Sequence, residues 1–198
     1  GKGCRNMIFL TFGTGLGAGL ILNGELYSGT NGMAGEAGHI RLAEDGPVGY
    51  GKAGAFEGFC SGGGIAQLGQ VMAEEALDRE EIPSFCQSKG ELFKVNARTI
   101  AEAAEKGDPL ALKIYDIVAD RLGQGLAILV DLLNPEKIVI GSIFLRQEKL
   151  LRPRMEKILN KESLEQSLSV VEVLPAGLGE KLGDYAAVSV GLRAYQKK

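Results

Sequence analysis

The sequence predicts an α/β fold in which short apolar strands alternate with helices. Three observations support this prediction. A glycine-rich turn near the start lies between apolar runs at residues 7–12 and 20–22. A β-branched run at residues 137–140 leads directly into a small-residue loop, and helical runs with recognisable caps lie between and after these strands. Ligands of α/β folds bind outside the carboxyl ends of strands, so both loops are candidate sites.

The composition is typical of one globular domain that can bury a sizeable core. The 198 residues are 45% hydrophobic and 24% charged, with a formal net charge of -3. This balance provides no basic surface. We therefore expect this segment to bind neither nucleic acid nor an anionic membrane.

The cysteines and the apolar runs predict the cellular location of the protein. Cys4, Cys60 and Cys86 are odd in number and widely spaced, which favours neither a disulfide framework nor a metal cluster. The most apolar run, residues 126–133, contains Asp131 and is well below the ~20 residues that a membrane helix needs. No signal peptide is recognisable. We expect a cytoplasmic chain without a membrane span.

The turn Gly13-Thr14-Gly15, with Gly17 two residues later, is a candidate phosphate-binding loop. A dinucleotide-binding fingerprint needs a helix after the glycines, but the sequence here predicts a second strand that ends in an Asn23-Gly24 type I′ turn. A Walker A loop needs a lysine, and none follows the glycines until Lys52. Backbone N–H groups and the Thr14 hydroxyl can instead face an anion. A glycine-rich hairpin without a ligand remains the alternative.

The segment after this hairpin carries polar residues in an unusual setting. Residues 28–39 are mostly small and include Glu36 and His39, the only histidine of the chain. Such a segment cannot pack a core, which suggests a functional use. A short strand is predicted over residues 39–43, followed by a turn and by a glycine-rich loop over residues 48–55 that leads to Phe56-Glu57.

Helices are predicted next. Apolar residues recur at helical spacing over residues 65–77, whereas a proline and a glycine make residues 78–95 irregular. A second helix over residues 98–106 ends at Gly107. Asp108-Pro109 then provides the N-cap and the first helical position of a long helix that runs to residue 133.

Two glycines interrupt the long helix. Gly123 and Gly125 each cost roughly 1 kcal/mol against alanine, so their presence predicts the close approach of another backbone or of a flat ligand. The strand at 137–140 follows and runs into Gly141-Ser142. A helix over residues 147–160, a strand over 169–174 and a helix over 183–195 complete the alternating pattern.

Five motifs, taken in order, resemble the ROK family, named for repressor, open reading frame and kinase. They are Gly13-Thr14-Gly15-Leu16-Gly17-Ala18-Gly19, Ala34-Gly35-Glu36-Ala37-Gly38-His39, Phe56-Glu57 with Cys60-Ser61-Gly62, Leu133-Asn134-Pro135-Glu136-Lys137-Ile138-Val139-Ile140-Gly141, and Leu182-Gly183 through Ala187. The resemblance covers essentially the whole chain. It implies the actin-like ATPase fold, with ribonuclease H-like halves, a mixed sheet and flanking helices, which binds ATP with Mg²⁺ in an interdomain cleft and a hexose beside it.

The resemblance also implies roles for single residues. Phosphate binding falls to Gly13, Thr14, Gly15 and Gly17, sugar binding to Glu36, His39 and Glu57, and adenosine binding to Gly141 and Ser142. Chemistry supports the sugar set independently, because carboxylates accept hydrogen bonds from vicinal hydroxyls and imidazole can donate or accept. A structural histidine remains the alternative for His39. A second glycine is usual at the Ser142 position.

Two departures from the family pattern have consequences. Many members hold a structural zinc with one histidine and three cysteines, but the cysteine positions here are Val48, Tyr50 and Ala55. A tetrahedral zinc site therefore cannot form in that way, and no zinc is expected. We expect the loop over residues 48–55 to be held by packing instead, through Tyr50 and Phe56.

The second departure concerns catalysis. The catalytic aspartate and the first phosphate loop of the family lie upstream of its Gly-Thr-Gly strand, and the 198 residues contain neither. The resemblance therefore implies the C-terminal lobe, residues 1–198, of an ATP-dependent hexose kinase, inactive alone. The resemblance also implies a hexose or N-acetylhexosamine as the substrate and a homodimer as the assembly. The effector domain of a sugar-sensing repressor and a degenerate pseudokinase are the alternatives.

Overall fold

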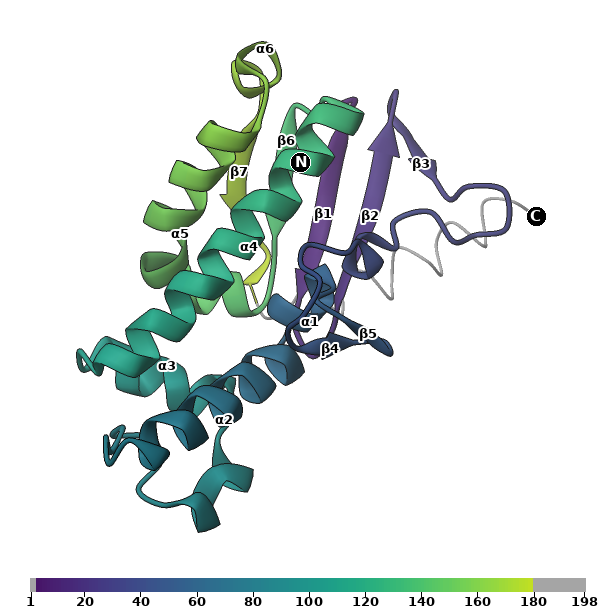
Figure 1. Cartoon of the computed structure of the whole chain (residues 1–198). Coiled ribbons are helices and arrows are strands. Elements are labelled where there is room, and N and C mark those ends of the chain that lie inside the picture. Colours follow the sequence, from purple (N-terminus) through teal and green to yellow (C-terminus); the bar gives the residue numbers. More distant parts are fainter. Residues whose placement is uncertain (1–2, 180–198) are drawn as a thin grey trace.

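The computed structural model describes residues 3–179 and has a mixed sheet at its centre (Figure 1). Its five strands lie in the order β3-β2-β1-β6-β7. The antiparallel part consists of β1 (Met7–Phe12), β2 (Leu16–Leu22) and β3 (Glu25–Tyr27). The parallel part adds β6 (Lys137–Ile140) beside β1 and then β7 (Glu172–Pro175). The α/β class with a mixed sheet is confirmed, whereas the helix predicted over residues 183–195 and the motif at 182–187 lie outside the described residues.

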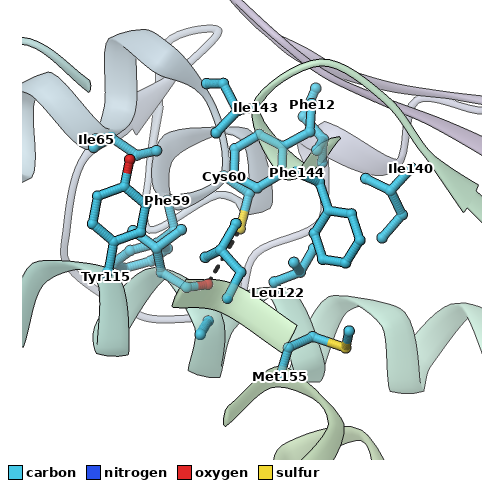
Figure 2. Packing of buried hydrophobic residues seen from close by; sticks show 14 of the residues in the cluster. Phe12, Phe59, Cys60, Ile65, Tyr115, Leu122, Ile140, Ile143, Phe144 and Met155 are labelled. Carbon is cyan, nitrogen blue, oxygen red and sulfur yellow. Dashed lines mark hydrogen bonds between the residues drawn. The ribbon is translucent and has the colours of Figure 1, made fainter. Parts of the chain in front are cut away.

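Both parallel crossovers place a helix on the same face of the sheet. α4 (Pro109–Leu133) leads from the β1 side to β6, and α5 (Ile143–Glu162) leads from β6 to β7 in the same direction across the sheet. The two helices therefore pack against each other, as Figure 1 shows. Their buried side chains meet the inward face of the strands, for example at Phe12, Leu122 and Phe144 (Figure 2).

The helix boundaries follow from their caps. Asp108 Oδ1 accepts the N–H groups of Leu110 and Ala111, at 3.0 and 2.9 Å, and starts α4 as predicted. The same helix ends at Asn134, whose φ of 44° is left-handed. α2 (Gly62–Asp78) begins before the predicted residue 65, because the Ser61 hydroxyl accepts the Gly64 N–H at 3.0 Å. α3 (Ala97–Glu105) begins with a capping box of Asn96 and Thr99.

Three boundaries in the second half and in the hairpin differ from the prediction. α5 starts at Ile143 and contains a non-helical residue at Gln147, the predicted start. The turn that follows α6 (Glu165–Leu168) occupies residue 169, the predicted start of the strand over 169–174, and β7 begins at Glu172. β2 begins at Leu16 rather than residue 20, because Gly17 pairs with Thr11 and donates its N–H to the Thr11 hydroxyl at 3.0 Å.

The prediction of a strand over residues 39–43 is wrong. A 3-10 turn, η1 (Ala37–His39), ends there instead, and Arg41 forms only an isolated bridge with Ala55. The alternation of apolar and polar residues is misleading here, because this segment does not join a sheet. Leu42 and Ala43 instead both donate their N–H groups to the Gly54 carbonyl, at 2.8 and 3.1 Å. The prediction that residues 78–95 are irregular is confirmed, with one 3-10 segment, η2 (Lys89–Lys94).

The glycines of α4 serve close packing within the protein. A Cβ on Gly123 would lie 2.7 Å from the Met155 carbonyl oxygen and 2.7 Å from the Ile158 Cβ of α5. A Cβ on Gly125 would overlap the ring of Phe56, which is fully buried at the start of α1 (Phe56–Phe59). Of the two predicted explanations, the approach of another backbone is therefore confirmed for Gly123, and an aromatic side chain takes the space at Gly125.

Candidate nucleotide and sugar site

The Gly-Thr-Gly turn follows β1 directly and is fixed by backbone hydrogen bonds. Gly13 donates its N–H to the Gly15 carbonyl at 3.0 Å, and Gly62 at the start of α2 donates to the Gly13 carbonyl at 2.7 Å. The turn is thereby attached to a helix N-terminus. Gly13 and Thr14 line a cavity of about 360 Å³, which we call the glycine cavity.

Three helices begin at the glycine cavity. Its lining includes Gly62 of α2, Ala97 of α3 and Ile143 of α5, each of which is the first residue of its helix. Helix N-termini carry partial positive charge, so three of them at one cavity favour an anion. The first N–H groups of α2 and α3 are already bonded to Gly13, Ser61 and Asn96, whereas α5 has no side-chain cap. Arg146 also lines this cavity and adds a formal positive charge. The arrangement suits a polyphosphate even though the chain as a whole is acidic.

The two adenosine-loop candidates lie against the turn. Gly141 donates its N–H to the Leu10 carbonyl at 3.0 Å and continues the ladder between β1 and β6. Ser142 lines the glycine cavity, and a Cβ on Gly13 would lie 3.3 Å from the Ser142 hydroxyl oxygen. The backbone of Ser142 has φ of 58° and ψ of -112°, a conformation that suits glycine far better than serine.

A second cavity continues from the glycine cavity between α3, α4 and α5. Its volume is about 540 Å³, and it shares Ala97, Ile143 and Arg146 with the first. Tyr115 of α4 closes one side; its hydroxyl donates to the Ala97 carbonyl at 3.3 Å, and burial raises the pKa of this phenol. Sequence reasoning missed Asn96 and Arg146. Asn96 was recognisable as a helix N-cap, and Arg146 lies one helical turn after Ser142.

The three predicted sugar ligands share another cavity. Glu36, His39 and Glu57 line a space of about 270 Å³ together with Leu16, Met33, Gly38 and Tyr50. Glu36 and His39 flank the short η1 segment, and Glu57 lies in the first turn of α1. We call this space the carboxylate cavity. Residues that are separated in sequence thus line one small cavity.

Glu57 connects the carboxylate cavity to the Gly-Thr-Gly turn. Its Oε2 accepts the backbone N–H of Leu16 at 2.9 Å, and a Cβ on Gly15 would lie 2.8 Å from the same oxygen. Gly38 is equally confined, because a Cβ there would overlap the Leu16 carbonyl and lie 3.1 Å from the Glu57 Cβ. Small residues on both segments therefore allow the carboxylate to reach the turn.

Gly17 is not brought together with the other phosphate candidates. It lies within β2, where its N–H is bonded to Thr11, and it lines neither the glycine cavity nor the carboxylate cavity. A Cβ on Gly17 would lie 3.6 Å from the Thr11 hydroxyl oxygen, an ordinary van der Waals distance, so space alone does not require glycine there.

The loop over residues 48–55 is a small hairpin held by hydrogen bonds. It contains β4 (Val48–Gly49) and β5 (Lys52–Ala53). The Gln67 amide both accepts the Val48 N–H and donates to the Val48 carbonyl, each at 3.0 Å, and Arg41 donates to the Ala53 carbonyl at 2.8 Å. Phe56 packs as predicted. Packing by Tyr50 is contradicted, because this side chain is 89% exposed.

Within residues 3–179, no group of three or more histidine, cysteine, aspartate and glutamate side chains is arranged to hold a metal ion. No helix in the same range is both long enough and apolar enough to cross a bilayer.

Comparison with known proteins identifies relatives along most of the chain. A model of the ROK family matches residues 1–190. A glucokinase from Halalkalibacterium halodurans is 37% identical over 156 residues, which are 77% of this chain and 46% of that protein. The transcriptional dual regulator NagC from Escherichia coli is 31% identical over 190 residues, which are 93% of this chain and 44% of the regulator.

A solved structure is also similar to this chain along most of its length. The ROK family glucokinase from Streptomyces griseus, in complex with glucose and AMPPNP, superposes with a TM-score of 0.70 at 28% identity, over 91% of this chain and 58% of that one. The actin-like ATPase fold predicted from the motifs is thereby confirmed. The chain spans about half the length of the curated relatives it matches.

Proposed function

Because this chain belongs to the ROK family, we propose that it is the nucleotide- and sugar-binding lobe of an ATP-dependent hexose kinase. The observation that supports this most is the contact of Glu57, which lines the carboxylate cavity, with Leu16 and Gly15 at the Gly-Thr-Gly turn. Phosphoryl transfer needs the terminal phosphate and the accepting hydroxyl to be held next to each other. A carboxylate that contacts both the candidate phosphate loop and the candidate sugar cavity meets that need.

In this proposal the glycine cavity receives the phosphates of ATP. Backbone N–H groups of Thr14 and Gly15 would bind phosphate oxygens. The dipoles of the three helices would favour the negative charge, and Arg146 would add a positive charge. Gly141 and Ser142 would lie under the adenosine, toward the larger cavity between α3, α4 and α5. Mg²⁺, bound through the phosphate oxygens, would neutralise the charge of the transferred group.

The carboxylate cavity receives the sugar. Glu36 and Glu57 are acceptors for neighbouring hydroxyls in charge-assisted hydrogen bonds, and His39 can donate or accept. Such groups orient a hexose or an N-acetylhexosamine and leave one hydroxyl directed at the phosphate loop. Glu57 is an orienting group here, since one of its oxygens already accepts the Leu16 N–H.

Residues 1–198 form the C-terminal lobe in this proposal. The supporting fact is that the matched region makes up about half of each relative. The catalytic base, an aspartate, and the first phosphate loop would belong to another lobe, so this chain alone is expected to be inactive. A cytoplasmic homodimer is part of the same proposal, and size-exclusion chromatography with light scattering on the intact protein measures its mass.

A coupled ADP-release assay on the intact protein tests the kinase proposal. Glucose, fructose, mannose, N-acetylglucosamine and N-acetylmannosamine are the substrates to compare. We expect turnover with at least one sugar, and we expect Gly15→Ala to reduce it strongly, because the added methyl would displace the Glu57 carboxylate. Gly90→Ala is the matched control, since a Cβ there meets only the Ser88 hydroxyl at 3.8 Å. Absence of turnover with every sugar would contradict the proposal.

The similarity to NagC supports a second candidate, the effector domain of a sugar-sensing repressor. The Gly-Thr-Gly turn favours the kinase, because a regulator has no need to hold phosphates. Two observations separate the candidates. A helix-turn-helix ahead of this chain would favour the repressor, and a further phosphate loop there would favour the kinase. Calorimetry that finds sugar binding without ATP binding would support the repressor or a pseudokinase.

A further inference from the structure

Two hairpins of the chain turn through two-residue loops in the same backbone conformation. Asn23-Gly24 joins β2 to β3 with φ of 56° and 86°, and Tyr50-Gly51 joins β4 to β5 with φ of 45° and 77°. Positive φ at both loop residues is characteristic of a type I′ turn, whose first position favours asparagine, aspartate or glycine. The first hairpin follows this preference. The second places a tyrosine where the backbone disfavours it.

Packing does not compensate for the unfavourable turn position of Tyr50. The side chain is 89% exposed, more than any other exposed large apolar residue among those the structure describes. A bulky aromatic residue in a left-handed conformation costs free energy, and here almost none of its surface is withdrawn from water in return. Local preference is most often violated at functional sites, which makes the surroundings of this ring informative.

The Tyr50 ring lies at the carboxylate cavity. Its centroid is 6.2 Å from that of the His39 imidazole, with an edge-to-face angle of 80° between the rings. Met33, which is 58% exposed, lines the same cavity. Two exposed apolar side chains therefore accompany the polar groups of Glu36, His39 and Glu57. This combination suits a pyranose, which has polar hydroxyls at its edge and apolar C–H groups on its faces.

The hairpin tip is held firmly although the ring is exposed. Gln67 bonds both backbone groups of Val48, and Lys52 Nζ donates to the His39 carbonyl at 2.7 Å. Gly49 lies so close to Glu57 that a Cβ would be 2.9 Å from the glutamate Cβ. These contacts fix the backbone of the hairpin relative to His39 and Glu57, so little further ordering of the loop is needed when a ligand arrives.

We propose that Tyr50 is a sugar-contacting residue whose ring covers a C–H face of the pyranose held by Glu36, His39 and Glu57. The inference rests on the proposed function, because it needs a sugar in the carboxylate cavity. The ring contributes affinity for the sugar and takes no part in nucleotide binding, since it lines the carboxylate cavity and not the glycine cavity.

Two measurements on the intact protein test this role. Isothermal titration calorimetry with glucose and N-acetylglucosamine as probes gives the Kd of the sugar, and thermal unfolding in the absence of sugar gives the Tm. Tyr50→Asn installs the residue that the turn prefers. We expect it to raise the Kd of the bound sugar about three- to tenfold, the range for loss of an aromatic contact, while raising the Tm. Tyr50→Phe keeps the ring and is expected to hold the Kd within about twofold.

The first hairpin provides a matched control. Asn23→Tyr places a tyrosine in the same turn position away from the cavity, and we expect it to lower the Tm and leave the Kd unchanged. If Tyr50→Asn lowers the Tm, or leaves the Kd unchanged in a protein that binds sugar, the inference is overturned while the proposed sugar site stands. If the wild-type protein binds neither of these sugars nor any other sugar of the turnover assay, the proposed function fails and the inference falls with it.

Discussion

Glu57 accepts the backbone N–H of Leu16 through Oε2 at 2.9 Å, across 41 positions of the chain. This single hydrogen bond joins the start of β2, directly after the Gly-Thr-Gly turn, to the carboxylate cavity. The other carboxylate oxygen is left to accept from a ligand. Glu57 therefore makes two contributions to the proposed site: one oxygen holds the residue after the turn, and the other can orient the sugar.

Removing the charge of Glu57 is expected to weaken sugar binding. Glu57→Gln keeps the shape of the side chain but replaces charge-assisted hydrogen bonds, each contributing about 1.5–3 kcal/mol, by weaker neutral ones. We expect the sugar Kd to rise roughly tenfold or more by calorimetry. Glu75→Gln, on the exposed face of α2, is the control. Equal sugar affinity for the two variants would rule out a direct role of the Glu57 carboxylate.

The backbone at Ser142 predicts a stabilising substitution. With φ of 58° and ψ of -112°, the serine is strained, whereas glycine adopts this conformation freely. Because such strain costs on the order of 1–3 kcal/mol and glycine loses more entropy on folding, Ser142→Gly should raise the free energy of unfolding by about 1 kcal/mol. Urea denaturation of the intact protein measures it. Ser142→Ala retains the Cβ and should give no gain, so equal effects would argue against strain.

Gly125 is expected to tolerate no side chain. A methyl group there would overlap the ring of Phe56, and overpacking of a buried contact costs about 1–3 kcal/mol. Gly125→Ala should therefore lower the free energy of unfolding by that amount, and combining it with Phe56→Leu should recover part of the loss. If the double variant loses at least as much free energy of unfolding as the two single variants together, the clash is not the cause.

Asp108 is expected to make stability depend on pH in the acid range. Partial burial of the carboxyl opposes ionisation, but hydrogen bonds from the backbone N–H groups of Ala111, Ser84 and Leu110 outweigh it and hold the pKa of Asp108 below 3.8. A folded-state pKa below the unfolded value means stability that is present above pH 3.8 and is lost as the pH falls through the lower folded value.

Urea titrations at neutral pH and at successively lower pH test this dependence. Asp108→Asn keeps a good N-cap but cannot ionise, so its loss of stability on acidification should be smaller than that of the wild type. Asp108→Ala removes the cap and should cost about 1 kcal/mol at neutral pH. Identical acid profiles for the wild type and Asp108→Asn would show that another group controls this range.

Local rules predicted many elements correctly because their signals lie close together in sequence. The Asp108-Pro109 start of α4 depends on a side chain and the next few N–H groups, and the Asn23-Gly24 turn depends on two φ values. The same rules placed a strand at residues 39–43, where the hydrogen bonds instead go to Gly54, outside any sheet. Alternation indicates one buried face but does not identify the partner that covers it.

The sequence by itself determined the fold class, the glycine turn and the set of residues that could hold phosphate and sugar, because each depends on local backbone freedom or on the chemistry of a side chain. Only the tertiary structure decided which of them meet. It joins Glu57 to Leu16 and separates Gly17 from the two cavities. It also packs the Phe56 ring against Gly125 and places the exposed Tyr50 beside His39. These relationships depend on how distant segments cross, and small residues at the crossings, rather than any one motif, allow that approach.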